Sequence, residues 1–115
     1  MELKLFQVDA FTSTVFSGNP ACIIPLDSWL DDSTLLEITK ENAVAETAFF
    51  IKKKDHFHLR WFTPDIEMDL CGHATLAAAH CILSELHQNK SKVVFESMSG
   101  RLEVEKVDHY YQMIL

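Results

Sequence analysis

The stretch "ATLAAAHCIL" (residues 74–83) decides the fold, because only Thr75 and His80 in it are polar. A helix that is apolar on nearly all of its sides is normally enclosed by other elements. Its alanines carry small side chains, so the residues of a sheet can approach the helix closely. The stretch therefore predicts a central helix, over about residues 72–87, with a sheet wrapped around it.

The remainder of the chain is typical of short strands and one further helix. The segment 31–43, "DDSTLLEITKENA", combines residues that cap helices with an apolar face, so it predicts an amphipathic helix. Strands are expected where polar and apolar residues alternate or where short apolar runs lie between turns. These segments are 2–9, 21–26, 44–51, 56–62, 92–97, 101–107 and 110–115. Many strands joined by hairpin turns, with two helices, predict an α+β fold with a mostly antiparallel sheet.

Composition limits the classes of protein that the chain can represent. It has 115 residues, which suits one domain, and 48% of them are hydrophobic, which supports a core. The net charge is -7, and the one basic run, Lys52-Lys53-Lys54, is followed at once by Asp55. We interpret this run as a solvated turn, and nucleic-acid binding is not expected.

The cellular location and the redox state of the cysteines are inferred from the lack of a membrane span or signal peptide and from the cysteine spacing. No stretch approaches the roughly 18 apolar residues of a membrane span. Residues 1–11 alternate like a strand and do not resemble a signal peptide. Cys22, Cys71 and Cys81 form no CxxC pair, which favours reduced thiols. We expect a cytoplasmic protein with no membrane partner.

Glu46 is the first candidate for chemistry. In "AVAETAFF" (43–50), the period of a strand places Glu46 on the same face as Ala48 and Phe50. If that face is enclosed, the carboxylate is kept away from water and can take a proton from carbon and return it elsewhere. If that face is open, Glu46 is a solvated residue at the edge of a strand.

A metal site is one hypothesis for the start of the central helix. His73, His80 and His87 are seven residues apart in the sequence. Because seven residues of helix rise about 10.5 Å, no two of these histidines can bind one ion. The histidines at 56 and 58 share a strand face but have no obvious partners in the sequence. We therefore expect no metal.

A reactive thiol and an anion site are the two other hypotheses for this region. Cys71 precedes the helix, whose N-terminus would favour a thiolate, and Cys22 is the alternative nucleophile. The anion site needs only the backbone, since Gly72 lets a ligand approach the unpaired N–H groups of the first turn. The side chains of His73 and Thr75 could add hydrogen bonds.

Four segments together resemble the PhzF-like isomerases of phenazine biosynthesis. They are "DAFTSTVFSGNPACII" (9–24), "LLEITKENAVAETAFF" (35–50), "LRWFTPDIEMDLCGHATLAAAH" (59–80) and "SGRLEVE" (99–105). Their order and spacing match across essentially the whole chain. The resemblance implies one half of a diaminopimelate epimerase-like fold, in which two similar halves enclose the active site between them. Each half is implied to be a barrel-like sheet wrapped around a central helix.

The resemblance also implies a cofactor-free isomerase that moves a proton between carbons of a small ring carboxylate. Glu46, in the "ETAF" motif, is implied as the acid and base. The substrate-binding residues that it implies are Asn19, Gly72, His73, Ala74 and Thr75. Cys71 is implied to lie at the edge of the pocket and not to act as the nucleophile, because the family retains the glutamate.

Family members are roughly twice this long, in keeping with two domains. Residues 1–115 would then be the N-terminal domain, with the C-terminal half absent, and inactive or incomplete alone. The expected partners are a small carboxylate and either the missing half or a second copy in a homodimer. The alternatives are a non-catalytic half-domain that binds a carboxylate or self-associates, and a cysteine-dependent epimerase or racemase.

Overall fold

The computed structural model of the protein describes residues 6–8, 21–42, 46–69, 72–86, 90–107 and 110–114. Each helix and strand that the sequence predicts is present. The strands are β1 (Phe6–Val8), β2 (Ala21–Leu26), β3 (Glu46–Lys52), β4 (Phe57–Phe62), β5 (Glu67–Met68), β6 (Lys92–Ser97), β7 (Gly100–Val107) and β8 (Tyr110–Ile114). The helices are α1 (Asp32–Asn42), α2 (Gly72–Cys81) and the π-helical turn η1 (Ile82–Leu86).

All of these strands belong to one mixed sheet. Its order is β1-β2-β3-β4-β6-β7-β8, and β5 pairs with β4 away from this path. The pairings β2–β3 and β4–β6 are parallel, whereas the others are antiparallel. The prediction of a mostly antiparallel sheet is therefore confirmed. The hairpin between β6 and β7 depends on Gly100, whose φ of 96° is the left-handed region that favours glycine.

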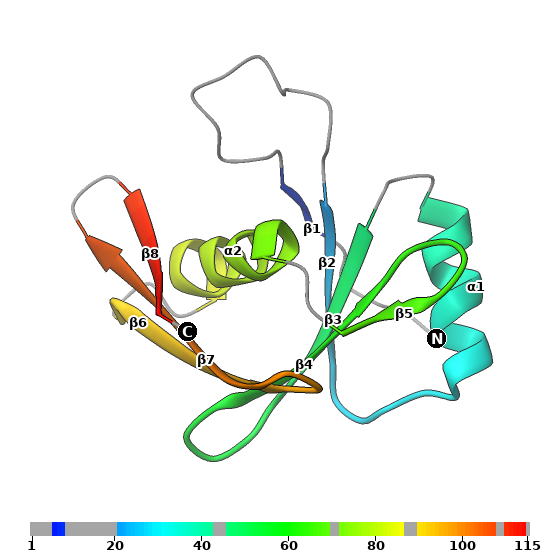
Figure 1. The fold of residues 1–115 in the computed structure, drawn as a ribbon, viewed down its shortest axis with the longest axis horizontal. Helices are drawn as coiled ribbons and strands as arrows, with labels where there is room; N and C mark the ends of the chain where they lie inside the picture. The colour runs from blue at the N-terminus through cyan, green and yellow to red at the C-terminus, as the bar shows by residue number, and fades with distance from the viewer. Residues whose placement is uncertain are drawn as a thin grey trace.

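The sheet curves around α2 and forms a trough (Figure 1). β1, β2 and β3 lie on one side of the helix, β4 lies below it, and β6, β7 and β8 lie on the other side. The prediction of a barrel-like sheet needs correction, because β1 and β8 do not pair in the described part of the chain. A barrel closes only when its two edge strands hydrogen-bond to each other.

The walls of the trough bury α2, as the alanine-rich stretch predicts. Ala74, Ala77, Ala78 and Ala79 are each at most 2% exposed. They pack in one core with side chains from both sides of the trough and with Trp61 on β4. Only small side chains let a helix approach strands from several directions at once. Within the described residues, no helix has the length and apolar character needed to span a membrane.

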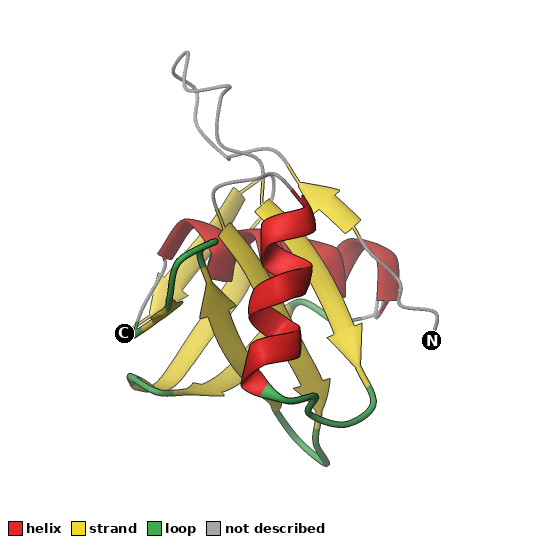
Figure 2. Cartoon of the chain, turned by 90° about the vertical axis from the view of Figure 1, so that its right-hand side faces the viewer, coloured by secondary structure: helices red, strands yellow, loops and turns green. Residues whose placement is uncertain are grey.

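α1 covers the opposite face of the same sheet, so α2 and α1 lie on either side of the strands (Figures 1 and 2). Leu35, at the centre of its apolar face, is fully buried against Phe49 and Ile51 of β3. The alternate residues of β3, Ala48 and Phe50, pack on the α2 side instead. The strands at the centre of the sheet are thus buried on both faces, which explains why "ACIIPL" is almost continuously apolar.

The far end of α2 is joined to the last strand by a polar cluster. The Nδ1 atom of His80 lies 2.8 Å from the hydroxyl oxygen of Tyr111 on β8. The hydroxyl oxygen of Ser84 lies 3.3 Å from each of those two atoms. His80, the polar exception in the apolar stretch, is therefore half-buried and holds the helix to the second arm of the trough.

Candidate functional site

Glu46 is the first residue of β3 and lies on the α2 face of the sheet. Its strand neighbours on that face, Ala48 and Phe50, belong to the core around α2. The side chain is half-buried, and its Oε2 atom has no appreciable contact with solvent. Glu46 is thus partly enclosed, because one of its carboxylate oxygens is shielded from water.

The first turn of α2 lies at the same end of the trough as Glu46. Ile82, just past the last turn, lines a cavity together with Lys52, the last residue of β3, and with Lys53 and Lys54, which follow it. The ten residues of α2 span about 15 Å. The helix therefore begins toward the opposite end of β3, and Figure 1 shows its start beside the upper ends of β2 and β3.

The other residues of the predicted site are described to different extents. The backbone of Gly72 begins α2, and His73 follows it. Ala74 and Thr75 are fully buried, so their side chains form part of the core around the helix. Asn19 and Cys71 lie outside the described residues. The structure thus brings Glu46 to the end of the sheet where Gly72 starts the helix.

Trp61 lies next to Glu46 on the same face. It pairs with Ala48, which makes it a diagonal cross-strand neighbour of Glu46, and such neighbours are typically about 7–8 Å apart. The indole is fully buried, yet its Nε1–H donates no hydrogen bond to any described residue. Beside Glu46, β4 thus contributes a buried indole whose N–H has no acceptor among the described residues.

Neither of the described cysteines suits a nucleophile. Ala21 and Ile23, the neighbours of Cys22 on β2, face α2. Because side chains alternate along a strand, Cys22 lies on the opposite face of the sheet from Glu46. Its side chain is buried, and burial raises the pKa of this thiol. A raised pKa lowers the thiolate fraction and hence the reactivity. Cys81 is 1% exposed within the core around α2. Among the described residues, no three His, Cys, Asp or Glu side chains gather as metal ligands would.

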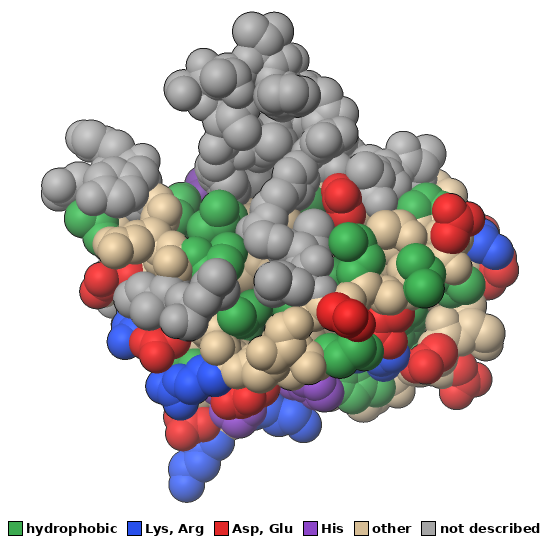
Figure 3. All heavy atoms as spheres, in the orientation of Figure 1, with side chains coloured by type: hydrophobic (Ala, Val, Ile, Leu, Met, Phe, Trp, Pro, Cys, Tyr) green, Lys and Arg blue, Asp and Glu red, His purple; other side chains and the backbone are tan. Residues whose placement is uncertain are grey.

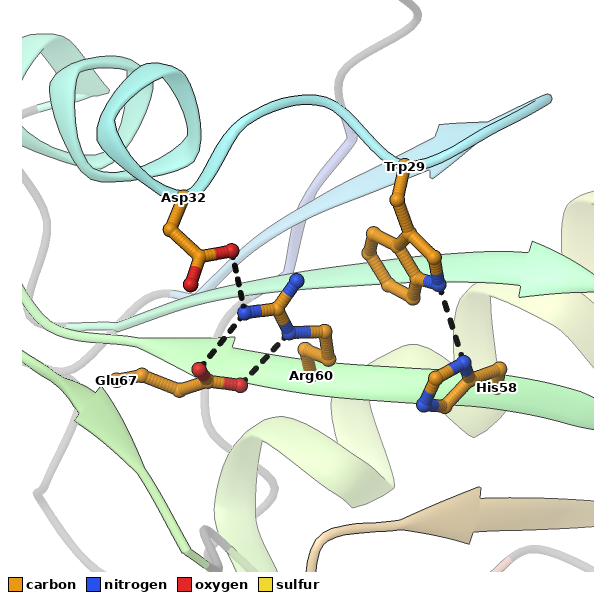
Figure 4. A network of polar contacts seen from close by, with 5 residues as sticks. All are labelled: Trp29, Asp32, His58, Arg60 and Glu67. Carbon is orange, nitrogen blue, oxygen red and sulfur yellow. Dashed lines mark hydrogen bonds and ion pairs between the residues drawn. The ribbon is translucent and has the colours of Figure 1, made fainter.

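A second polar cluster lies on the α1 face and is centred on Arg60 of β4 (Figure 4). The Nε and Nη2 atoms of Arg60 donate to the two carboxylate oxygens of Glu67, at 2.7 and 2.8 Å. Nη2 also donates to Asp32, at the start of α1, at 2.9 Å. The hydrogen bonds to Glu67 are the main cause of a raised pKa of Arg60. Because its charge is already matched, Arg60 holds α1 and β5 to the sheet and does not receive an anion.

His58, two residues before Arg60, belongs to the same cluster. Its Nδ1 atom accepts a hydrogen bond from the indole Nε1–H of Trp29 at 3.1 Å, and the two rings meet edge to face (Figure 4). An imidazole that accepts at Nδ1 carries its proton on Nε2 and is neutral. Burial, followed by the positive charges of Lys53 and Arg60, lowers the pKa of His58 below its ordinary value of 6.5.

This arrangement predicts that the protein loses stability on acidification. The folded chain keeps His58 neutral, whereas the unfolded chain binds a proton at this residue below pH 6.5. The free energy of unfolding should therefore fall as the pH drops from 6.5 toward the lower folded pKa. Urea denaturation at a series of pH values between 5 and 8 measures this slope. In His58→Gln, whose amide oxygen can still accept from Trp29, the slope should be smaller, and an unchanged slope would contradict the assignment.

Comparison with known proteins bears on what the site at Glu46 does. A family model described as "Phenazine biosynthesis-like protein" matches residues 8–114, nearly the whole chain. The chain belongs to the phenazine biosynthesis-like family. One relative in this family, an uncharacterized isomerase of Pseudomonas aeruginosa, is 49% identical over 106 residues, which are 92% of this chain and 41% of that protein.

Solved structures in the phenazine biosynthesis-like family share the fold. A putative PhzC/PhzF protein from Clostridium difficile superposes with a TM-score of 0.90 at 43% identity, covering 99% of this chain and 44% of that chain. A "Predicted Epimerase" of Pseudomonas aeruginosa, at 23% identity, shows a related fold with a TM-score of 0.76, over 96% of this chain and 41% of that one. The chain thus spans about two fifths of the length of these proteins and corresponds to their N-terminal half.

The sequence alone did not reveal the Arg60 cluster of this family member. Alternation along β4 does place His58 and Arg60 on one face, opposite Leu59 and Trp61. However, Asp32 is 28 residues away from its partner Arg60 in the chain, and Trp29 is 29 residues away from its partner His58. Because His58 was considered only as a metal ligand, nothing in the sequence indicated its hydrogen bond with Trp29. A polar face on an otherwise buried strand was the one available signal.

Proposed function

We propose that this chain provides the proton-transferring half of a cofactor-independent isomerase that acts on a small ring carboxylate. The observation that carries the proposal is the half-buried carboxylate of Glu46 on the α2 face of the trough. Glu46 is at the first end of β3, and the first turn of α2 lies toward that same end. Membership of the phenazine biosynthesis-like family and the name "isomerase" of a close relative support it.

In the proposed reaction Glu46 acts first as a base and then as an acid. Its carboxylate takes a proton from a ring carbon that lies next to a double bond, so the C–H electron pair delocalises into the adjacent π-system. The carboxylic acid then returns the proton to a different carbon. The net result is an isomer of the substrate, with no change in oxidation state. General acid–base catalysis of this kind requires a carboxyl group within hydrogen-bond reach of the carbon-bound proton.

The start of α2 is proposed to bind the carboxylate of the substrate. The first N–H groups of a helix have no partner within the helix, and its dipole favours a negative charge there. Gly72 has no side chain to obstruct a ligand, and His73 would add a hydrogen bond. Asn19 and Cys71 are proposed to lie at the edge of the same pocket. Anchoring the substrate at this end of the trough would bring its ring toward Glu46.

The second wall of the pocket is proposed to come from a partner. The chain covers 41% of its Pseudomonas aeruginosa relative, so the remainder of such a protein would complete the cleft. A second copy of the chain, in a homodimer, is the alternative source. Either partner would exclude water, which strengthens the electrostatic interactions of Glu46 with the substrate. Sedimentation equilibrium of the chain alone distinguishes a dimer from a monomer.

The proposal predicts that the chain exchanges protons at a ring carbon of the substrate faster when a partner completes the pocket. The chain is mixed with the remaining part of the Pseudomonas aeruginosa relative in D₂O, together with a set of cyclohexadiene carboxylic acids. Mass spectrometry should show deuterium at a ring carbon of at least one of them, at a rate well above that of the chain alone. The absence of exchange in the complex, while the intact relative exchanges the same compounds, would overturn the proposal.

A further inference from the structure

A group of lysines that the proposed reaction does not use surrounds a cavity of about 230 Å³. Three of them end β3 and begin the turn after it, and the other two lie just before and at the start of β6. They are Lys52, Lys53, Lys54, Lys90 and Lys92. The parallel pairing of β4 with β6 brings these segments together, although they are more than thirty residues apart in the chain. Figure 3 shows several basic side chains at the lower left of the molecule, with acidic side chains and histidines among them.

The positive charge of this cavity is largely unmatched. Among the described residues that line it, Asp55 is the one acidic side chain, and its carboxylate contacts His56 at 2.8 Å. Lys92 forms an ion pair with Glu103. The other four lysines form no ion pair with any described residue. In a chain with a net charge of -7, such a local excess of ammonium groups runs against the overall charge.

The cavity is more than a solvated turn, because it has a defined wall and an apolar floor. A hydrogen bond of 2.8 Å from the backbone N–H of Lys53 to the carbonyl of His56 closes the turn. Phe57, Ile82 and Val93 line the cavity beneath the lysines, and each is at most 9% exposed. The rigid elements β4, β6 and η1 therefore support the segments that carry the ammonium groups.

We propose that this cavity binds a small soluble anion that carries two or more phosphate groups. Several flexible ammonium groups around one cavity suit a multiply charged anion, because each additional charge contact adds to the affinity. The cavity volume admits a diphosphate and excludes a large ligand from its interior. The site is separate from Glu46, since the seven residues of β3 place its two ends about 20 Å apart.

Isothermal titration calorimetry with inorganic pyrophosphate tests the proposal. The wild-type chain should bind one pyrophosphate, and binding should weaken as the salt concentration rises. The triple variant Lys53→Gln/Lys54→Gln/Lys90→Gln should weaken the affinity about tenfold or more. These side chains are exposed, so the variant should fold as the wild type does, which circular dichroism verifies.

Two controls separate this site from general charge effects and from the proposed enzyme site. Lys40→Gln/Lys106→Gln removes two exposed lysines that lie outside the cavity and should leave pyrophosphate affinity within about twofold. Glu46→Gln should also leave it unchanged, so failure of the isomerase proposal would not affect the result. Equal weakening by the control pair would overturn the site. So would binding of a single-stranded oligonucleotide by a chain that binds no pyrophosphate.

Discussion

Replacing Glu46 by glutamine should lower the rate of deuterium exchange into a ring carboxylate by about 100-fold or more. Glutamine has nearly the same shape as glutamate but cannot accept the proton from carbon. The side chain is half-buried at the end of a paired strand, so the substitution should leave the fold intact. The exchange assay uses the chain completed by the C-terminal part of a relative, and the melting temperature of the variant is measured beside it.

Glu67→Gln is the matched control for this experiment. Glu67 is also a half-buried glutamate of a sheet strand, but it lies with Arg60 on the α1 face. Its replacement should leave the exchange rate unchanged and lower the free energy of unfolding by about 1.5–3 kcal/mol, because charged hydrogen bonds are lost. Glu46→Asp should give an intermediate rate, since the carboxylate is kept but withdrawn by one methylene. Wild-type exchange in Glu46→Gln would show that another residue moves the proton.

The fold around α2 could be predicted from the sequence because one physical requirement explains the whole alanine stretch. A helix without a polar face needs walls on every side, and small side chains let those walls approach. The helix and most strand positions followed from periodicity, which is a local property. Closure of the sheet is not local, since it depends on whether β1 and β8 pair. The sequence therefore predicted a curved sheet correctly but not that it remains open in the described residues.

Strand alternation identified which residues accompany Glu46 but not which side of the sheet they occupy. β3 is buried on both faces, so Ala48 and Phe49 are equally hidden and hydropathy does not distinguish the two faces. In the structure, α2 packs against the face that carries Ala48, and α1 packs against the face that carries Phe49.

The lysine cavity could not be predicted from the sequence for a similar reason. The sequence shows "KKK" next to Asp55, and only the pairing of β4 with β6 adds Lys90 and Lys92.

Trp61→Ala should produce the largest loss of stability among single substitutions in the trough. The indole is fully buried among the alanines of α2 and the side chains of β3 and β4. Truncating a buried aromatic residue removes its hydrophobic burial and leaves a cavity, which together cost about 3–5 kcal/mol. That is a large part of the roughly 5–15 kcal/mol that stabilises an ordinary domain. Equilibrium denaturation by urea measures the loss. Ile66→Ala, at a side chain that is 63% exposed, should change stability by less than about 0.5 kcal/mol.

Trp61→Phe separates the packing of this residue from its polar atom. Phenylalanine keeps an aromatic ring in the core but removes the Nε1–H, which has no acceptor among the described residues. A buried donor without a partner costs about 1–3 kcal/mol, so its removal offsets much of the volume that the smaller ring leaves empty. The variant should therefore stay within about 1 kcal/mol of the wild type. If Trp61→Phe is as damaging as Trp61→Ala, the indole N–H contributes a hydrogen bond in solution, and the floor of the trough beside Glu46 is more polar than the structure shows.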